Sequence, residues 1–106
     1  MSPIQYFKNT SIDNGMVEIS PDSLDLQPKH ELIDVRGEDE YHGPLGHIEG
    51  SKLVPLPTLL EQAAGWNRDT PLVVVCRSGG RSGRAVRALQ DLGFRNVVNL
   101  RGGMMG

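Results

Sequence analysis

One segment of this chain, residues 72–92, constrains the fold more than any other. Residues 72–75 are the apolar run L-V-V-V, residues 76–82 are the loop C-R-S-G-G-R-S, and apolar side chains then recur at helical spacing over residues 85–92. A short, wholly apolar run is typical of a strand that is buried on both faces, as in a parallel sheet. The order strand, loop and helix therefore predicts a parallel α/β fold.

The rest of the chain repeats this alternation of strand-like and helix-like segments. One-sided helical stripes cover residues 56–63 and 85–92, and each stops at a glycine, Gly65 or Gly93. Ser-Pro at residues 20–21 predicts the start of a further helical turn. Other strands are predicted at residues 16–19, 32–35, 52–54 and 96–100. The expected fold is an open parallel sheet of about five strands with helices on both faces.

Length and composition bound the number of domains. The chain has 106 residues, of which 38% are hydrophobic, so it is expected to form one domain with a single core. Residues 1–15 carry no clear period and predict an N-terminal extension that is closed by a turn at residues 13–15. The domain is expected to cover residues 16–106.

Charge and apolar patterning exclude several classes of partner. Eleven Lys and Arg residues against thirteen Asp and Glu residues give a formal net charge of -2, so there is no basic field for a nucleic acid. No apolar run approaches the ~20 residues that cross a bilayer, and residues 1–10 lack the apolar segment of a secretory signal. A single cysteine cannot form a disulfide within the chain. We expect a soluble protein in a reducing, cytoplasmic setting, without nucleic-acid or membrane partners.

Cys76 is a candidate nucleophile because of its position and its neighbours. Ligands of parallel sheets bind beyond the carboxyl ends of the strands, and the predicted strand at residues 72–75 ends immediately before Cys76. Glycines, the N–H groups at the start of the next helix and the cations of Arg77 and Arg81 favour an anion in this loop. Such a cradle is expected to lower the pKa of the Cys76 thiol. The simpler interpretations are a core-filling cysteine, which needs no such loop, and two solvated arginines.

Four motifs in a fixed order give the chain a specific resemblance. They are L-I-D-V-R at residues 32–36, E-Y at 40–41 with G-H-I-E-G-S at 46–51, the Cys76 loop, and V-N-L-R-G-G at 98–103. Over residues 17–103 the chain resembles the single-domain rhodanese family. The resemblance implies that the first motif ends a core strand of the parallel sheet and that the cysteine loop follows a later strand.

The resemblance also implies an activity, sulfane-sulfur transfer. The Cys76 thiolate attacks the outer sulfur of thiosulfate or a related donor, releases sulfite or its equivalent, and keeps the sulfur as a persulfide. A nucleophilic acceptor, such as a thiol, cyanide, or a sulfur-carrier or thioredoxin-like protein, then removes it. No metal or organic cofactor is needed, because the loop dipoles stabilise the sulfur anion. On the family's pattern, the residues that hold the donor and the persulfide are Arg77, Ser78, Gly79, Gly80, Arg81 and Ser82.

Asp34 and Arg36 are further candidates, because they follow a predicted strand and reach the same sheet edge as Cys76. They are able to orient the loop or to bind the donor, but the favoured interpretation is a structural ion pair. His47 is expected to be a packed, hydrogen-bonded turn residue. The three histidines lack zinc-ligand spacing with the single cysteine, so no metal site is predicted.

Two features depart from the family's pattern. The family commonly continues past the glycine turn at residues 102–103 into a helix that contains a tryptophan, whereas this chain stops at Gly106. The domain is therefore expected to be truncated before a terminal helix. Residues 42–45 form a longer spacer between the E-Y and G-H motifs than the family's shorter versions have.

Two other functions stay open. Cysteine phosphatases and arsenate reductases also use a cysteine in an anion-binding loop, but they have five residues between the cysteine and the arginine. Here four residues separate Cys76 from Arg81, and Ser82 takes the place of the phosphatase arginine. The other alternative is a non-catalytic or redox-sensing binding module, in which Cys76 is incidental or reports oxidation.

Overall fold

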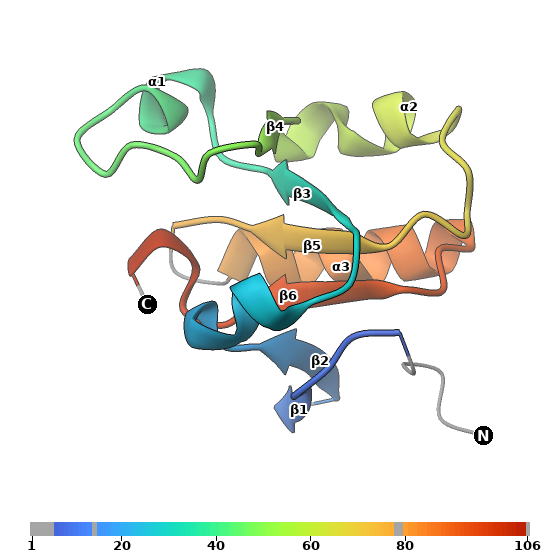
Figure 1. Ribbon diagram of the computed structural model, residues 1–106. Helices are drawn as coiled ribbons and strands as arrows, with labels where there is room; N and C mark the ends of the chain where they lie inside the picture. Colours follow the sequence, from blue (N-terminus) through green and yellow to red (C-terminus); the bar gives the residue numbers. More distant parts are fainter. Residues whose placement is uncertain (1–5, 14, 78–79, 106) are drawn as a thin grey trace.

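A mostly parallel sheet lies at the centre of the molecule (Figure 1). The computed structural model describes residues 6–13, 15–77 and 80–105. Over these residues the strands are β1 (Ser11–Asp13), β2 (Met16–Ile19), β3 (Glu31–Asp34), β4 (Lys52–Leu53), β5 (Leu72–Val75) and β6 (Val97–Leu100). Their spatial order is β1-β2-β6-β5-β3-β4, and every neighbouring pair is parallel except β1 and β2. The predicted open α/β sheet is confirmed.

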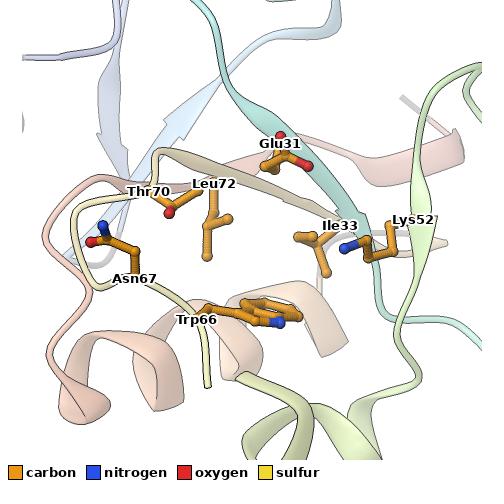
Figure 2. Close-up of a pocket in the computed structure, with 7 residues that line it drawn as sticks. All are labelled: Glu31, Ile33, Lys52, Trp66, Asn67, Thr70 and Leu72. Atoms are coloured by element: carbon orange, nitrogen blue, oxygen red, sulfur yellow. The ribbon is translucent and has the colours of Figure 1, made fainter. Parts of the chain in front are cut away.

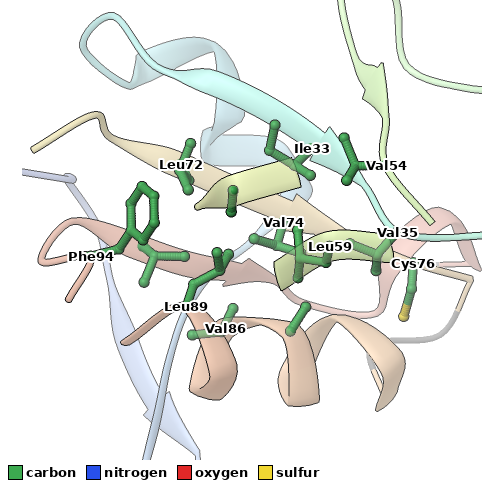
Figure 3. Close-up of a cluster of buried hydrophobic side chains, with 13 residues drawn as sticks. Ile33, Val35, Val54, Leu59, Leu72, Val74, Cys76, Val86, Leu89 and Phe94 are labelled. Atoms are coloured by element: carbon green, nitrogen blue, oxygen red, sulfur yellow. The ribbon is translucent and has the colours of Figure 1, made fainter. Parts of the chain in front are cut away.

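Two of the α-helices cover one face of this sheet. The described α-helices are α1 (Glu38–Tyr41), α2 (Leu59–Ala63) and α3 (Gly80–Leu92), and the 3-10 helices are η1 (Pro21–Leu26), η2 (Leu56–Thr58) and η3 (Gly103–Met105). Leu59 of α2 and Val86 of α3 pack with Val74 of β5 in a buried apolar cluster (Figure 3). Because side chains alternate along a strand, Val73 and Val75 of β5 point to the other face.

The opposite face is covered by shorter segments. Phe7 of the N-terminal segment is buried there, and Leu24 of η1, Ile48 and Met104 of η3 pack against the same cluster. Both faces of the sheet are therefore covered, by α2, α3 and η2 on one side and by η1, η3 and extended segments on the other. This arrangement explains why all four residues of β5 and all four of β6 are buried.

One strand was not predicted from the sequence. Residues 11–13 form β1, whereas the pattern indicated an extension without a strand. Three residues are too few to show a period of two, and β1 exists because it pairs with β2, with Ile12 opposite Val17. The sheet has six described strands as a result, against about five expected.

The helices differ from the predicted ones in detail. Leu60, which belonged to the predicted apolar stripe, is 49% exposed, whereas Leu59 and Ala63 are buried. α3 begins at Gly80, ahead of the predicted apolar stripe at residues 85–92, and ends before Gly93, whose φ of +113° is the expected helix stop. Among the described residues, no helix has the length and apolar composition that crossing a membrane requires.

The carboxyl ends of β3 and β5 lie together at one edge of the sheet. Asp34 and Val75 are partners in register, and the backbone N–H of Val35 donates to the Val75 carbonyl over 3.0 Å. Arg36 and Cys76, which follow these strands, therefore reach the same edge, as the sequence predicted.

Candidate active site

Cys76 lies directly after β5, and its side chain is buried, with 1% of its surface exposed. Figure 3 shows it at the end of the core cluster, near Val35. The Cys76 Sγ lies 3.4 Å from the hydroxyl oxygen of Ser82, in the first turn of α3. The predicted position at the sheet edge is thus confirmed, while the sulfur itself is covered by protein.

Part of the predicted cradle around Cys76 is described by the structure. Ser78 and Gly79 lie outside the described residues, so the hydrogen bonds predicted for them stay predictions. Gly80 begins α3, and Arg77 is exposed.

A hollow of about 450 Å³ opens at this edge of the sheet, beside the cysteine loop. Its lining residues are Arg36, Asp39, Glu40, Pro44, Leu45 and Arg77. Two cations, Arg36 and Arg77, and two carboxylates, Asp39 and Glu40, therefore line a space that is large enough for a small ion. Arg77, which directly follows Cys76, brings the hollow next to the loop.

Arg81 forms a close ion pair that the sequence did not predict. Its Nη1 and Nη2 each donate to one carboxylate oxygen of Glu40 in α1, both over 2.6 Å. These hydrogen bonds, together with the backbone N–H of Gly37, lower the pKa of Glu40 to about 2. The pKa of Arg81 is raised, first by its hydrogen bonds to Glu40 and also by a charge interaction with Cys76. The guanidinium of Arg81 therefore lies within electrostatic reach of the sulfur.

Asp34 and Arg36 form the predicted ion pair, and it is buried. Nε and Nη2 of Arg36 donate to the Asp34 carboxylate over 2.9 and 2.8 Å, and neither side chain is more than 1% exposed. The same guanidinium donates to the carbonyls of Gly46, over 2.7 Å, and Glu40, over 3.3 Å. Arg36 thus fastens α1 and the loop after it to the sheet edge. The hydrogen bonds to Asp34 raise the pKa of Arg36 above its ordinary value.

A line of buried polar side chains runs from Cys76 to the neighbouring strands β6 and β2. Ser82 donates to Oδ1 of Asn99 in β6, and Nδ2 of Asn99 donates to Oε2 of Glu18 in β2 over 3.1 Å. Glu18 in turn pairs with Arg101 over 3.6 Å. The sequence held one signal of this line: Asn99 interrupts an apolar run that is predicted to be a buried strand, and a buried amide needs partners.

The backbone at Gly103 and Met104 packs directly against the backbone of the cysteine loop. The N–H of Met104 donates to the Cys76 carbonyl over 2.8 Å, and Gly103 has a φ of +55°. A Cβ at Gly103 would lie only 2.2 Å from the Cys76 carbonyl oxygen and 2.9 Å from the Arg77 carbonyl group. The glycine turn near the C-terminus is therefore part of the site's backbone, which its distance along the chain does not reveal.

A second hollow, of about 280 Å³, lies at the amino ends of β3 and β5 (Figure 2). Its lining residues are Glu31, Ile33, Lys52, Trp66, Asn67, Thr70 and Leu72. The Lys52 ammonium lies 5.7 Å from the centre of the Trp66 ring, which forms one wall. Neither Cys76 nor any other predicted site residue lines this hollow, so the carboxyl edge remains the candidate active site.

Known proteins share this fold and sequence pattern. The family model described as a rhodanese-like domain matches residues 20–106. The uncharacterized protein YqhL of Bacillus subtilis is 39% identical over 75 residues, which cover 71% of this chain but only 58% of YqhL. Thiosulfate sulfurtransferase 18 of Arabidopsis thaliana is 31% identical over 103 residues, which cover 84% of this chain and 74% of the relative.

A solved structure agrees with this assignment. The crystal structure of a rhodanese-like domain protein from Staphylococcus aureus matches with a TM-score of 0.73 and 29% identity, over 84% of this chain and 90% of that one. The segment that the family model matches, residues 20–106, contains the cysteine loop and the strands from β3 to β6. This chain therefore belongs to the rhodanese-like domain family.

Proposed function

We propose that this protein is a sulfurtransferase that carries sulfane sulfur as a persulfide on Cys76. The observation that carries the proposal is the surroundings of the sulfur: it lies at the carboxyl edge of a parallel sheet, 3.4 Å from the Ser82 hydroxyl. Arg81, held by Glu40, is close enough to interact with its charge. A cysteine that only fills the core needs neither neighbour. Membership of a family that includes a named thiosulfate sulfurtransferase supports the same activity.

The reaction has two covalent steps. The Cys76 thiolate attacks the outer sulfur of thiosulfate, the bond between the two thiosulfate sulfurs breaks, and its electron pair leaves with sulfite. An acceptor nucleophile then attacks the outer sulfur of the persulfide, and the electron pair of that bond returns to Cys76 as a thiolate. Sulfur moves without an external oxidant or reductant. The N-terminal end of α3 and the cation of Arg81 favour the negative sulfur in both steps.

Arg77 is the better of the two loop arginines for holding an anionic donor. It is exposed and lines the 450 Å³ hollow, whereas Arg81 shares its charge with Glu40. Arg36 lines the same hollow, but Asp34 neutralises its charge. In this proposal Arg77 binds the donor, and Arg81 acts on the sulfur.

The acceptor is a small thiol, or a sulfur-carrier or thioredoxin-like protein, and cyanide replaces it in an assay. The outer sulfur of a persulfide is electrophilic, so any of these nucleophiles completes the cycle. A nucleophile that must return to a thiolate is suited to a reducing compartment such as the cytoplasm.

Mass spectrometry of the intact protein tests the proposal. After incubation with thiosulfate we expect one added sulfur atom, which cyanide or a thiol removes. Cys76→Ser is the control and should gain nothing. A wild-type protein that takes no sulfur from thiosulfate or other sulfane donors would contradict the proposal, and turnover of a phosphate ester by the same sample would favour a phosphatase.

A second candidate function, a redox-sensing or binding module, is supported by the burial of Cys76, which is 1% exposed. A buried thiol in apolar surroundings is usually inert. The same experiment separates the two functions: sulfur transfer requires a donor to reach the sulfur, whereas the module predicts that no donor changes the mass.

A further inference from the structure

In the line of buried polar side chains that starts at Cys76, the direction of each hydrogen bond can be assigned. The line runs from Cys76 to Ser82, then to Asn99 and Glu18. Three of these side chains are buried: Cys76 is 1%, Ser82 0% and Asn99 3% exposed. Glu18 is 9% exposed and pairs with Arg101 at the far end. With so little contact with water, each group depends on its protein partners for hydrogen bonding.

The directions follow from the chemistry of the donors and acceptors. The carboxylate of Glu18 only accepts, so the amide nitrogen of Asn99 must face it, as the 3.1 Å Nδ2–Oε2 contact has it. The amide oxygen of Asn99 then faces Ser82, and a carbonyl oxygen also only accepts. The single hydroxyl proton of Ser82 is therefore committed to Asn99.

This commitment decides what the Ser82 hydroxyl offers to Cys76. Toward the sulfur, 3.4 Å away, Ser82 presents an oxygen lone pair, which accepts a hydrogen bond from a thiol but has no proton to offer a thiolate. Ionisation of Cys76 removes the S–H bond to Ser82. If the Ser82 hydroxyl turns toward the sulfur instead, the buried amide oxygen of Asn99 loses its hydrogen-bond donor.

We propose that Asn99, oriented by Glu18, is a positioning residue that holds the Ser82 proton away from Cys76 and so favours the resting thiol over the thiolate. The inference rests on the proposed function in one respect, that Cys76 is the nucleophile. It deepens that function, because it assigns the line a regulating effect: the line opposes ionisation of the nucleophile, and a turn of the Ser82 hydroxyl toward the sulfur removes this opposition.

Other charged groups near Cys76 act in the opposite direction. Arg81 of α3 favours the thiolate, and its own partner is Glu40 of α1. Arg77, the next residue in the chain, is exposed. The Asp34–Arg36 pair at the end of β3 adds no net charge. None of these groups belongs to the hydrogen-bonded line, so substitutions in the line change its effect while these charges stay in place.

Titration of the single thiol tests the proposal. The pKa of Cys76 is measured from the ultraviolet absorbance of the thiolate, with Cys76→Ser subtracted to remove the tyrosine signal. In Asn99→Leu the Ser82 proton is released toward the sulfur, and we expect the pKa of Cys76 to fall by roughly half to one unit, the equivalent of about one hydrogen bond. Glu18→Gln, which no longer fixes the amide, should give a smaller shift in the same direction.

A double-variant comparison shows whether the effect passes through Ser82. In a Ser82→Ala background, Asn99→Leu should not move the pKa of Cys76 further. An unchanged or raised pKa in both Asn99→Leu and Glu18→Gln overturns the proposal, and so does a shift that persists without Ser82. Glu18→Gln keeps the test decisive if Asn99→Leu fails to fold, which thermal unfolding reports.

The titration also separates this inference from the proposed function. It needs no sulfur donor and no turnover. If the pKa of Cys76 does not shift while sulfur transfer is intact, the role of Asn99 is refuted and the proposed function is not. If the pKa of Cys76 shifts as expected but the protein never takes up sulfur, the role of Asn99 is retained and the proposed sulfurtransferase activity is refuted.

Discussion

Arg81 and Glu40 face each other in a two-pronged ion pair, with both N–O distances 2.6 Å, across 41 residues of sequence. The pair joins the start of α3 to α1 and holds the guanidinium of Arg81 in one position near Cys76. It also places a negative charge beside that guanidinium, which weakens the attraction of Arg81 for an anionic donor. This ion pair therefore supports the loop. In the proposed function it also leaves donor binding to Arg77, while Arg81 acts on the sulfur.

The ion pair makes stability depend on pH in a defined window. Glu40 has a pKa of about 2 in the folded protein against an ordinary value of 4.5, so folding favours its charged form. Its contribution to the free energy of unfolding is complete above pH 4.5 and is lost as the pH falls through 2. About a third of each side chain is exposed, so water screens the pair, and we expect a contribution of ~1 kcal/mol.

Urea denaturation of Glu40→Gln at several pH values measures this contribution. The variant should be less stable than the wild type near neutral pH, and the difference should shrink as the pH falls below 4.5. Glu38→Gln, at an exposed position of the same helix, is the matched control and should show no such convergence. Equal stability of Glu40→Gln and wild type at neutral pH would argue against the pair.

Arg77 gives a prediction about the donor. Because it is exposed and lines the hollow beside the loop, Arg77→Ala should raise the KM for thiosulfate and lower kcat/KM roughly 5- to 10-fold, with kcat little changed. Steady-state kinetics with thiosulfate and cyanide provide the measurement. Arg84→Ala removes another exposed arginine, in α3, and should leave kcat/KM within about twofold. A similar loss in both variants would indicate a general effect of net charge.

Asp34 tests whether the buried pair at the sheet edge is structural. Asp34→Ala leaves the buried guanidinium of Arg36 without its carboxylate, so we expect the free energy of unfolding to fall by about 3–5 kcal/mol. In the double variant Asp34→Ala, Arg36→Met no charge is left unpaired, and part of that stability should return. Urea denaturation measures both. Unchanged stability of Asp34→Ala together with a higher KM for thiosulfate would instead indicate a donor-binding role.

Much of the fold was predictable because its signals are local. The run at β5 is wholly apolar, the stripe of α3 has a helical period, and Gly93 adopts the φ of +113° that a helix stop requires. The position of Cys76 follows from the same local order of strand, loop and helix. β1 escaped prediction because it depends on pairing with β2, which no three-residue pattern reveals.

The partners of the site residues were less predictable, because they come from distant parts of the chain. Glu40 has the appearance of a solvated charge at the start of a helix, and only the folded chain brings it to Arg81. Asn99 signals that a partner exists but does not identify Ser82 or Glu18. Sequence patterns determine which face or edge a residue reaches. Specific pairs depend on strand register, as for Glu18 and Asn99, or on how two helices are placed, as for Glu40 and Arg81.

Gly103 provides a last prediction, on the backbone that supports the cysteine loop. In Gly103→Ala the new Cβ would lie 2.2 Å from the Cys76 carbonyl oxygen, so the backbone of the loop must move. The left-handed φ of +55° adds strain for any residue other than glycine. We expect a loss of about 2–4 kcal/mol in the free energy of unfolding, together with slower sulfur loading of Cys76.

Gly50→Ala separates the clash from the strain. Gly50 also has a left-handed φ, of +85°, but nothing lies within 4 Å of the position of its Cβ. This variant should lose only about 1 kcal/mol and load sulfur at the wild-type rate. Thermal unfolding and the rate of persulfide formation, followed by mass spectrometry, provide the comparison. If the two alanine variants lose equal stability and load sulfur equally fast, Gly103 supports the chain only through its own conformation and not through its contact with Cys76.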